Sequence, residues 1–443
     1  MLNKIERYIF YLFLFSIPFQ VRKVLWYEGW RFNEWQSVSV YVTDVLLVSL
    51  FIFWIAGYLR QGRKFSISNF QFPINFHFSI FKNPDFYLIL FLFISAISIK
   101  NSDDYVISWF RWLKLVEFTL FYWYLSNYAF KKFGLYNSAL VILISGVFQA
   151  LIAILQFMKQ SSLGLKYLGE SVINSDLAGI ASFYAATGEK VIRAYGTAPH
   201  SNVLAGYLLA ILFITYCLLC SKRIFPTACH LLFTAYSITL FAFFATFSRV
   251  IILAWGVSFL TGTMIYHSAY PRLVRNIFLI TLVVASIFTF LYWPEIMTRL
   301  VFDGEDQSVQ LRSFYNQEAL SGGINWFGVG MGNFVNWLVN RNLYLPAYAY
   351  QPVHNIYLLL YSETGLFGML TFLLFLIFLI KKSFSSRTTY YLLLTTSFLF
   401  IGFFDHFFLT LQQGSLIFWL SFGVLTFCSR SDTIKEQLDL QEG

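Results

Sequence analysis

The chain has 443 residues, of which 58% are hydrophobic and only 12% are charged, and its mean hydropathy is +0.63. Water cannot cover so apolar a chain on every side, which excludes an ordinary water-soluble protein and indicates a protein embedded in lipid. The net charge of +9 comes from basic residues scattered over many short loops with no continuous stripe. Membrane topology therefore explains this charge better than a nucleic-acid partner does.

Twelve apolar runs follow one another along the chain, and we interpret each as a candidate membrane-spanning helix. They lie near residues 8–21, 38–59, 86–99, 105–129, 135–158, 199–220, 224–246, 250–266, 276–293, 355–380, 390–408 and 411–428. A bilayer core of about 30 Å needs about 20 helical residues, a length that the two shortest runs do not reach. No small-residue cleavage site follows the first run, so we expect it to stay as a helix and not to be removed as a signal peptide. The predicted fold is an all-α, polytopic transmembrane helix bundle of about twelve spans.

Basic residues predict the orientation of these spans. With the N-terminus in the cytoplasm, positive charge is denser in the cytoplasmic loops than in the longer connections on the other side. The cytoplasmic loops then include four pairs of adjacent basic residues, Arg63-Lys64, Lys131-Lys132, Lys222-Arg223 and Lys381-Lys382. We therefore expect a multi-pass protein of the inner (cytoplasmic) membrane whose long connections are extracytoplasmic.

Two connections are long enough to carry structure of their own, residues 159–198 and residues 294–353. The second lies between the ninth and tenth spans and contains the helix-like stretch SVQLRSFYNQEAL, followed by the glycine-spaced turn GVGMGNF. Acidic residues before this stretch and glycines after it are typical helix boundaries. No repeat and no second soluble domain is evident, so residues 1–443 are predicted to form one membrane domain with a large external loop that carries helices.

Several arginines fall on the predicted extracytoplasmic side, where positive charge is less dense, and three of them are candidate site residues. Arg249 lies in the sharp turn TFSRVII, Arg193 lies just before the span near residue 199, and Arg312 lies in the helix-like stretch of the large loop. A guanidinium near the membrane surface needs an anionic partner, and a phosphate or pyrophosphate suits its bidentate geometry. The alternative is a salt bridge to one of the acidic residues on that side, which are Glu189, Asp303, Glu305, Asp306 and Glu318.

Two histidines stand where long connections enter spans, His354 in QPVHNIYLLLYSETG and His200 in GTAPHSNVLAGYL. A neutral imidazole at a wet membrane boundary can take a proton from a hydroxyl nucleophile, because its unperturbed pKa is near 6.5. The alternative is a boundary histidine bonded to a backbone carbonyl. His354 is the stronger candidate for a catalytic base.

Charged residues also occur within the apolar runs. Arg111, Lys114 and Glu117 recur every three residues in the fourth run, so they share one helix face. Charged groups in a span usually face the bundle interior or a cavity. They either pair with one another and fix helix packing or contact a substrate, and the same two interpretations apply to Asp44, Glu363, Asp405 and His406.

Other chemistry has little support in the sequence. The chain has no GxSxG elbow, no HExxH motif and no phosphate loop, and we interpret the GxGxG string at residues 328–332 as a turn. Among His200, His354 and His406, no two have the spacing of metal ligands on a helix. We therefore expect neither a metal nor a cofactor.

Four motifs in order carry a family resemblance. RAYGTAPHSNVLAGYL, the later SR turn, SVQLRSFYNQEAL followed by GVGMGNF, and HNIYLLLYSETGLFG together resemble the O-antigen ligase and polymerase family over roughly residues 190–410. The first 150 residues are similar to it only in hydropathy. The chain departs from the family where Ala198 stands in place of a frequent aromatic and Ser201 in place of a frequent proline, which affects the expected role of His200.

The resemblance implies a metal-independent, inverting glycosyltransferase. A glycan carried on undecaprenyl pyrophosphate would pass to a hydroxyl of a lipid, glycan or protein acceptor at the outer leaflet. Arg193 and Arg249 would hold the pyrophosphate with help from Arg312, and His354 would serve as the general base or orient the acceptor. The supporting residues would be His200, Asn355, Lys114 and Glu363. Two alternatives from other classes are a transporter or flippase for a lipid or polysaccharide, and a non-catalytic membrane scaffold.

Overall fold

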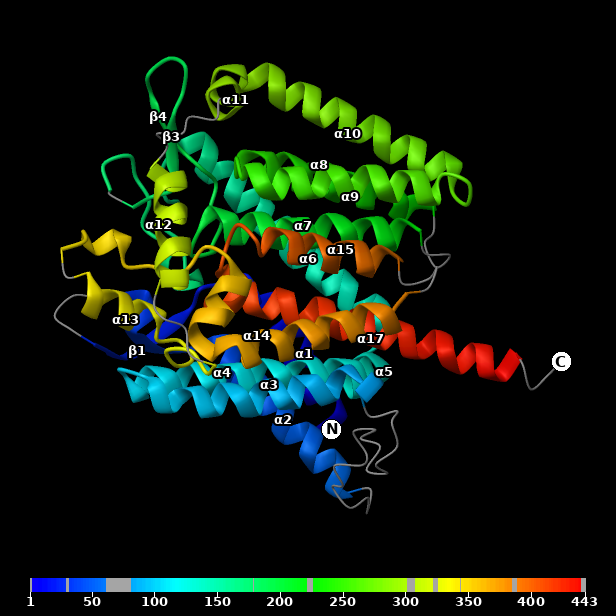
Figure 1. The fold of residues 1–443 in the computed structure, drawn as a ribbon. Helices are drawn as coiled ribbons and strands as arrows, with labels where there is room; N and C mark the ends of the chain where they lie inside the picture. The colour runs from blue at the N-terminus through cyan, green and yellow to red at the C-terminus, as the bar shows by residue number, and fades with distance from the viewer. Residues whose placement is uncertain are drawn as a thin grey trace.

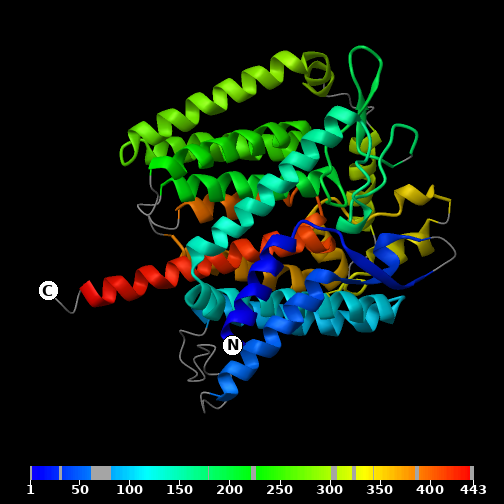
Figure 2. The same cartoon turned by 180° about the vertical axis from the view of Figure 1, so that it is seen from behind.

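The computed structural model describes residues 2–28, 32–60, 81–177, 179–220, 226–300, 307–321, 326–342, 344–384 and 389–439. Most of these residues are helical, and the long helices lie side by side in one bundle (Figure 1). The described residues within 17–41, 160–200 and 292–355 gather at one end of this bundle, which we call the cap end; it is on the left in Figure 1 and on the right in Figure 2. The described fold is thus a helix bundle with most of its irregular structure at one end.

Each apolar run of the sequence overlaps a bundle helix. The bundle helices are α1 (Leu2–Ser16), α2 (Val42–Arg60), α3 (Pro84–Ser98), α4 (Tyr105–Tyr124), α6 (Leu135–Lys159), α7 (Ser201–Leu219), α8 (Pro226–Ala245), α9 (Arg249–Tyr266), α10 (Pro271–Leu291), α14 (Ile356–Lys382), α15 (Thr389–Ile401) and α17 (Gln412–Asp439). A π-helical turn (Leu125–Ala129) and the short α5 (Phe130–Phe133) follow α4. The chain therefore has the helical segments that its hydropathy predicts.

Fewer of these helices qualify as complete spans than predicted. Within the described ranges, 6 helices are long and apolar enough to cross a membrane: Pro84–Asn101, Leu135–Lys159, Ser201–Leu219, Arg249–Tyr266, Pro271–Leu291 and Ile356–Lys382. Helix α1 is only 15 residues long, and α4 carries three charged residues in its middle. The predicted count of about twelve spans is not confirmed, although the chain is a multi-pass membrane protein by its apolar helices.

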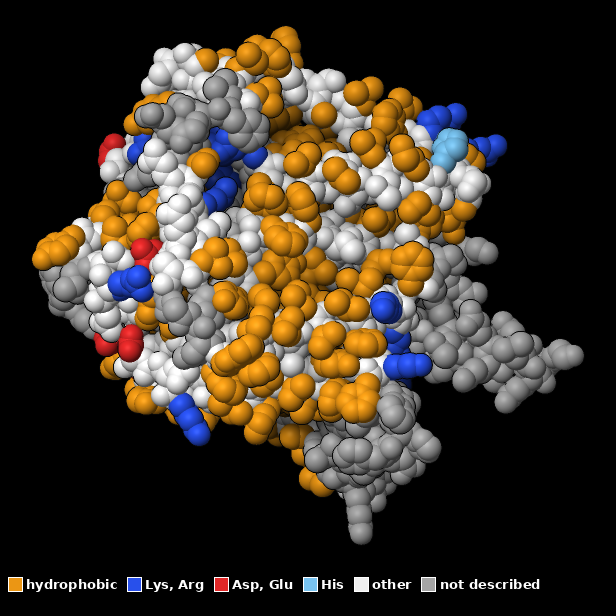
Figure 3. Space-filling model, in the orientation of Figure 1, with side chains coloured by type: hydrophobic (Ala, Val, Ile, Leu, Met, Phe, Trp, Pro, Cys, Tyr) orange, Lys and Arg blue, Asp and Glu red, His pale blue; other side chains and the backbone are white. Residues whose placement is uncertain are grey.

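The surface of the bundle fits a lipid environment. On the face in Figure 3, hydrophobic side chains cover the middle of the bundle, and charged side chains lie toward its two ends. Large apolar side chains of the bundle helices are widely exposed, including Phe290 at 85% and Met264 at 78%. Such a surface is stable only where hydrocarbon replaces water.

The expectation of an all-α fold needs a correction at the cap end. Residues 38–41, predicted as the start of the second span, belong to β2 (Ser37–Tyr41), which pairs antiparallel with β1 (Arg22–Tyr27). The stretch SVSVY alternates between a buried and a more exposed face, and this period of two is that of a strand. A second hairpin joins β3 (Ser182–Tyr184) to β4 (Lys190–Ile192).

Short helices complete the cap end, namely α11 (Trp293–Leu300), α12 (Gln307–Ser321), α13 (Phe334–Arg341) and α16 (Phe407–Thr410). The stretch SVQLRSFYNQEAL lies within α12, as predicted. Helix α12 packs on α14 through the fully buried Tyr315, whose hydroxyl donates a hydrogen bond to the Ala349 carbonyl at 2.7 Å. The large connection is therefore anchored to the bundle at α14.

The GxGxG string forms a turn, as predicted, and it docks on a kink in α14. Its glycines, Gly328, Gly330 and Gly332, all have positive φ angles. A Cβ atom on Gly328 would lie 2.4 Å from the carbonyl carbon of Glu363, and one on Gly365 would lie 2.1 Å from the carbonyl oxygen of Trp326. Only glycine permits both the left-handed backbone and this close approach. The contact fixes Gly365, the kink residue of α14, at φ 72°.

Candidate functional site

His354 lies at the cap end, two residues before α14 begins. Its Nε2 atom is 3.1 Å from Oε1 of Gln351, and its ring stacks on Tyr315 with centroids 5.6 Å apart. With Nε2 donating to this amide oxygen, Nδ1 carries the lone pair. Nδ1 is buried and has no hydrogen-bond partner in the described part of the chain. The geometry leaves a proton-accepting atom of His354 unused.

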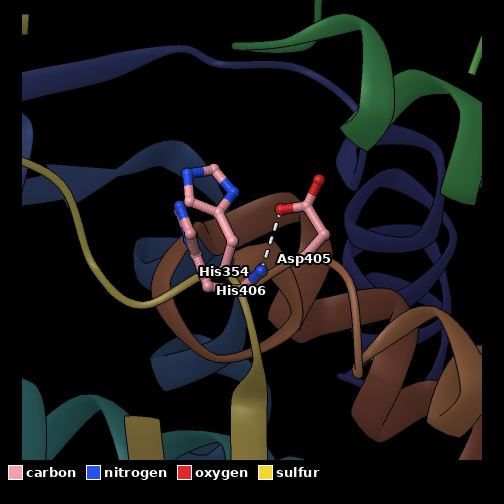
Figure 4. Close-up of side chains that lie close together, drawn as sticks. All are labelled: His354, Asp405 and His406. Atoms are coloured by element: carbon pink, nitrogen blue, oxygen red, sulfur yellow. Dashed lines mark hydrogen bonds between the residues drawn. The ribbon is translucent and has the colours of Figure 1, made fainter. Parts of the chain in front are cut away.

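A second histidine packs against the first. The rings of His354 and His406 meet edge to face with centroids 4.6 Å apart (Figure 4). The backbone N–H of His406 donates to Oδ1 of Asp405 at 2.8 Å, and its Nδ1 lies 2.7 Å from the Thr410 hydroxyl. His354 comes from the loop before α14, while Asp405 and His406 come from the loop between α15 and α16. The bundle thus assembles this cluster from two separate connections.

Arg193 lies directly after β4 and is only 9% exposed. Its Nε donates to the Thr246 carbonyl at 2.6 Å, and a terminal nitrogen donates to Oδ1 of Asn202 at 2.5 Å. The amide nitrogen of Asn202 donates in turn to Oδ2 of Asp405 at 2.7 Å. Asn202 therefore joins the Arg193 guanidinium to the Asp405 carboxylate. Arg193 forms no direct salt bridge with any described residue.

His200 caps α7. Its Nδ1 accepts a hydrogen bond from the backbone N–H of Asn202 at 3.1 Å, and the ring packs edge-on against Tyr195. This bond satisfies one of the free N–H groups at the helix start and orients Asn202. This contact involves only Nδ1, and the supporting role of His200 stays a prediction.

Arg249 is the first residue of α9 and is partly buried. The preceding Ser248 donates from its hydroxyl to Oδ1 of Asn202 at 3.1 Å, so the start of α9 is tied to the residue that contacts Arg193. Phe247 holds a left-handed backbone with φ 45°, an uncommon conformation for a bulky residue. Its ring packs against Phe157, Phe183 and Phe288, which hold this turn in place.

Arg312 of α12 contributes its charge to the same site. Burial lowers the pKa of His354 to about 4, with the Asp405 carboxylate opposing this shift and Arg312 adding to it. Burial likewise lowers the pKa of His406 to about 3. Both imidazoles are therefore neutral near pH 7 in this environment. Among the predicted acidic partners of the arginines, Glu318 pairs with Arg341 at 3.6 Å, while Asp303, Glu305 and Asp306 lie outside the described residues.

The charges near Arg193 and Asp405 influence each other. Burial, together with the positive charges of Arg299 and Arg312, lowers the pKa of Arg193 to about 9. Burial acts to raise the pKa of Asp405, but the adjacent histidines and Arg312 outweigh burial and bring the pKa to about 2. Cations in such proximity favour an anion between them.

The remaining sequence candidates are Asn355, Lys114 and Glu363. Asn355 is the N-cap of α14 and accepts from the backbone N–H of Tyr357 at 2.9 Å, which is a structural role. Lys114 pairs with Asp44 at 2.7 Å and with Glu117 at 2.5 Å, and Glu363 accepts from the backbone N–H of Gly332 at 2.9 Å. The pairing of Lys114 fits the interpretation that these charges fix helix packing.

Sequence reasoning did not identify Asn202, Arg299 or Gln351 as candidates. Asn202 stands two residues after His200 within a quoted motif, so the motif itself was the available signal. Arg299 is a further cap-end arginine, and one of its terminal nitrogens is 3.4 Å from the Phe247 carbonyl. Gln351 has no local signal, because its role appears only when its side chain meets the His354 ring.

His354, Asp405 and His406 also satisfy a simple criterion for a metal site. Each offers one ligand atom, and these atoms lie within 4.8 Å of one another. Zinc bonds of about 2.0–2.1 Å require neighbouring ligand atoms to lie about 3.4 Å apart, so the cluster would have to contract. Both oxygens of Asp405 already accept hydrogen bonds, and Arg312 adds positive charge nearby. The expected absence of a metal stays a prediction.

The comparison with known families agrees with the motifs. Residues 234–373 match a family model described as O-antigen ligase. The matched segment contains Arg249, Arg312 and His354 and begins after Arg193 and His200. A search of curated proteins found no match. The match covers less than half of the chain, and this segment is similar to O-antigen ligases.

Proposed function

We propose that this protein is a membrane glycosyltransferase that moves a glycan from undecaprenyl pyrophosphate to an acceptor hydroxyl at the extracytoplasmic face of the inner membrane. The observation that carries the proposal is a buried Arg193 that forms no salt bridge with any described residue and that is linked through Asn202 and Asp405 to the loop of His406, whose ring packs on a neutral His354. Arg193 can stabilise an anionic leaving group, and His354 can accept a proton from the acceptor hydroxyl. The O-antigen ligase match favours the same type of transfer.

The arginines have the role of stabilising the leaving group. Arg193, Arg249 and Arg312 contribute guanidinium groups that bind phosphate oxygens in a bidentate manner. As the bond between the anomeric carbon and the pyrophosphate oxygen breaks, negative charge grows on the pyrophosphate, and cations fixed in advance stabilise that state more than the ground state. This role makes the reaction metal-independent.

His354 has the role of general base, or at least of orienting the acceptor. The acceptor hydroxyl gives its proton to Nδ1, the resulting oxygen attacks the anomeric carbon, and undecaprenyl pyrophosphate leaves from the opposite face with inversion. The bound pyrophosphate raises the pKa of His354 from about 4, because a nearby anion favours the imidazolium. The proton then returns to solvent or to the departing pyrophosphate.

The test is a transfer assay with purified protein, a defined undecaprenyl-pyrophosphate-linked glycan and candidate acceptors. Arg193→Ala and Arg249→Ala should each lower kcat/KM about 100-fold or more, since one such donor is worth about 3 kcal/mol. Arg341→Ala is the matched control, because Arg341 is also a cap-end arginine and its partner is Glu318. Near-normal transfer by folded Arg193→Ala and Arg249→Ala proteins would contradict the proposal.

Transport of a lipid or polysaccharide is the second candidate, and the charges inside α4 motivated it. Lys114 is paired within the bundle, so this observation no longer favours transport. The same assay separates the two candidates, because a transporter moves its cargo without forming a new glycosidic bond.

A further inference from the structure

A large cavity lies in the half of the bundle away from the cap end. Its wall is formed by α5, the first turns of α6, the second half of α7, the start of α15 and the first half of α17. Its volume is about 440 Å³, and none of the candidate site residues at the cap end lines it. Protein interiors contain few voids larger than a water molecule, so a cavity of this size is a candidate binding site.

The cavity begins beside a close contact between α6 and α7. A Cβ atom on Gly146 would lie 2.4 Å from Cγ1 of Ile211, so the missing side chain lets the two backbones approach. From this contact α6 runs diagonally across the other helices, as the view from behind shows (Figure 2), so its first turns diverge from the end of α7. The wall residues on the two sides of the gap are small, namely Ser138 and Ala139 on α6 and Ala210 on α7. Such short side chains do not fill the space between diverging helices.

The wall of the cavity is apolar, and its serine hydroxyls bond within their own helices. The hydroxyl of Ser138 donates to the Gly134 carbonyl at 2.8 Å, and that of Ser421 donates to the Phe418 carbonyl at 2.7 Å. Among the described residues, no buried polar atom that lacks a partner belongs to this wall. A cavity that offers water so few partners stays dry and binds apolar ligands.

The volume of the cavity fits a long hydrocarbon chain. A dry, apolar cavity of about 150 Å³ binds one benzene, so a cavity about three times as large has room for about 16–18 carbons of an acyl chain. Leu135 and Ala139 are only half-buried in the wall, so the cavity reaches the outer surface of α6. On that surface Ile144 is 60% exposed, as expected of a side chain that faces lipid. A lipid chain can therefore enter from the bilayer.

One cation beside the cavity favours an anionic headgroup. Lys131 follows Phe130, a wall residue of the short α5, and its side chain is exposed. It forms no ion pair with any described residue, whereas the adjacent Lys132 pairs with Glu6 at 2.6 Å. Basic side chains at the cytoplasmic surface of a membrane attract anionic phospholipids, and α5 lies at the end of the bundle that is predicted to be cytoplasmic.

We infer that this cavity binds one acyl chain of an anionic phospholipid, such as phosphatidylglycerol, from the leaflet at the end opposite the cap, and that Lys131 contacts its phosphate. This site is separate from the proposed transfer reaction and does not depend on it. An acyl chain matches the cavity in length, whereas an undecaprenyl chain is several times longer and its pyrophosphate would lie at the cap end. The bound chain fills the space between α6, α7, α15 and α17 and thereby stabilises the bundle.

Photochemical labelling tests where the chain lies. The purified full chain is placed in phosphatidylcholine nanodiscs that contain a small fraction of phosphatidylglycerol with a diazirine on one acyl chain. After illumination, mass spectrometry should find the label on wall residues of α6, α7 or α17, and unlabelled phosphatidylglycerol should displace it. Ala139→Phe and Ala210→Phe each place a ring in the cavity. Each should lower the labelling about tenfold or more, because burial of one methylene group favours binding about fourfold and the ring displaces several.

Val283→Phe is the matched control, because Val283 is 56% exposed on α10 and the same ring there points into lipid. Wall labelling that is equal in the wild type and in either folded cavity variant overturns the inference. So does labelling of the wild type that excess phosphatidylglycerol leaves unchanged, a result that needs no variant to fold. If undecaprenyl phosphate displaces the label at lower concentration than phosphatidylglycerol does, the cavity belongs to the polyprenyl chain and the inference is wrong.

Lys131→Gln tests the headgroup. In competition for the cavity, the wild type should prefer unlabelled phosphatidylglycerol to phosphatidylcholine. Lys131→Gln should lower this preference about fivefold, because one lysine near the surface contributes about 1 kcal/mol to the binding of anionic lipid. Lys381→Gln is the control, because Lys381 is also exposed at the end opposite the cap and its ammonium lies 5.9 Å from the centre of the Phe378 ring. A preference that is equal in the wild type and Lys131→Gln overturns the assignment of an anionic phospholipid.

Discussion

Asn202 and Asp405 are joined by a hydrogen bond of 2.7 Å although they lie 203 positions apart in the chain. The side-chain oxygen of Asn202 accepts from Arg193 and from Ser248, so one amide connects the loop after β4, the start of α9 and the loop that carries His406. Asparagine suits this position because it donates and accepts at the same time. The candidate anion site and the candidate base are thereby held in one network.

Replacing this amide should weaken binding of the donor. Asn202→Ala removes the acceptor of Arg193 and the donor to Asp405, so we expect kcat/KM to fall about tenfold or more, since hydrogen bonds to charged groups contribute about 1.5–3 kcal/mol. Asn340→Ala is the control, because Asn340 is a cap-end asparagine that contacts the exposed Asp103. Steady-state kinetics with varied donor measures the effect. Equal kinetics for the two variants would show that the network has no part in transfer.

Acidification should destabilise the cap end. Burial lowers the pKa of His354, and of His200, from 6.5 to about 4. The unfolded chain therefore binds more protons between pH 6.5 and 4, and stability present above pH 6.5 is lost as the pH falls through this window. The melting temperature in detergent should fall as the pH is lowered through this window. In His354→Gln it should fall less steeply. His267→Gln, which changes an exposed histidine, should follow the wild type; a pH-independent melting temperature would contradict the burial of these rings.

His354→Gln should also separate binding from catalysis. The glutamine keeps a polar group near Gln351 but cannot accept a proton, so kcat should fall about 100- to 10,000-fold. The KM for the lipid-linked donor should stay within a few-fold, because the arginines are unchanged. A variant that loses donor affinity but keeps kcat would assign His354 to binding.

Chelation tests whether His354, Asp405 and His406 act without a metal ion or hold a catalytic cation. If the arginines replace a metal, EDTA leaves the transfer rate unchanged, and added Mg²⁺, Mn²⁺ or Zn²⁺ does not raise it. If the three residues hold a catalytic cation, EDTA abolishes transfer and one of these metals restores it. Asp405→Asn provides a second measurement, because it removes a metal ligand but leaves an oxygen that accepts from Asn202.

The glycine contact between the turn and α14 should be essential for folding. Gly328→Ala places a methyl group 2.4 Å from the Glu363 backbone at a positive φ, which no side-chain rotation relieves. We expect a lower melting temperature and less monodisperse protein. Gly256→Ala in α9 is the control, because no atom lies within 4 Å of the added Cβ and alanine favours a helix. Equal stability of the two variants would show that the turn does not depend on this close contact.

Local chemistry explains why parts of the molecule were predictable. The apolar runs, the helix in SVQLRSFYNQEAL and the turn in GVGMGNF all depend on neighbours within a few residues. The same local approach failed for residues 38–41, where an apolar run continued across a strand that pairs with Arg22–Tyr27. Whether a segment forms a strand depends on the partner segment with which it pairs, and a hydropathy pattern contains no information about that partner.

By itself, the sequence determined that this protein is embedded in lipid and where its helices lie. It also determined which arginines and histidines stand near the ends of those helices. These features follow from hydropathy and helix boundaries, which are properties of adjacent residues. Only the tertiary structure decided that Asn202 meets Asp405, that His406 packs against His354, and that Ala139 and Ala210 face one cavity. These contacts join segments that lie far apart in the chain, and helix packing, which no local pattern encodes, brings them together.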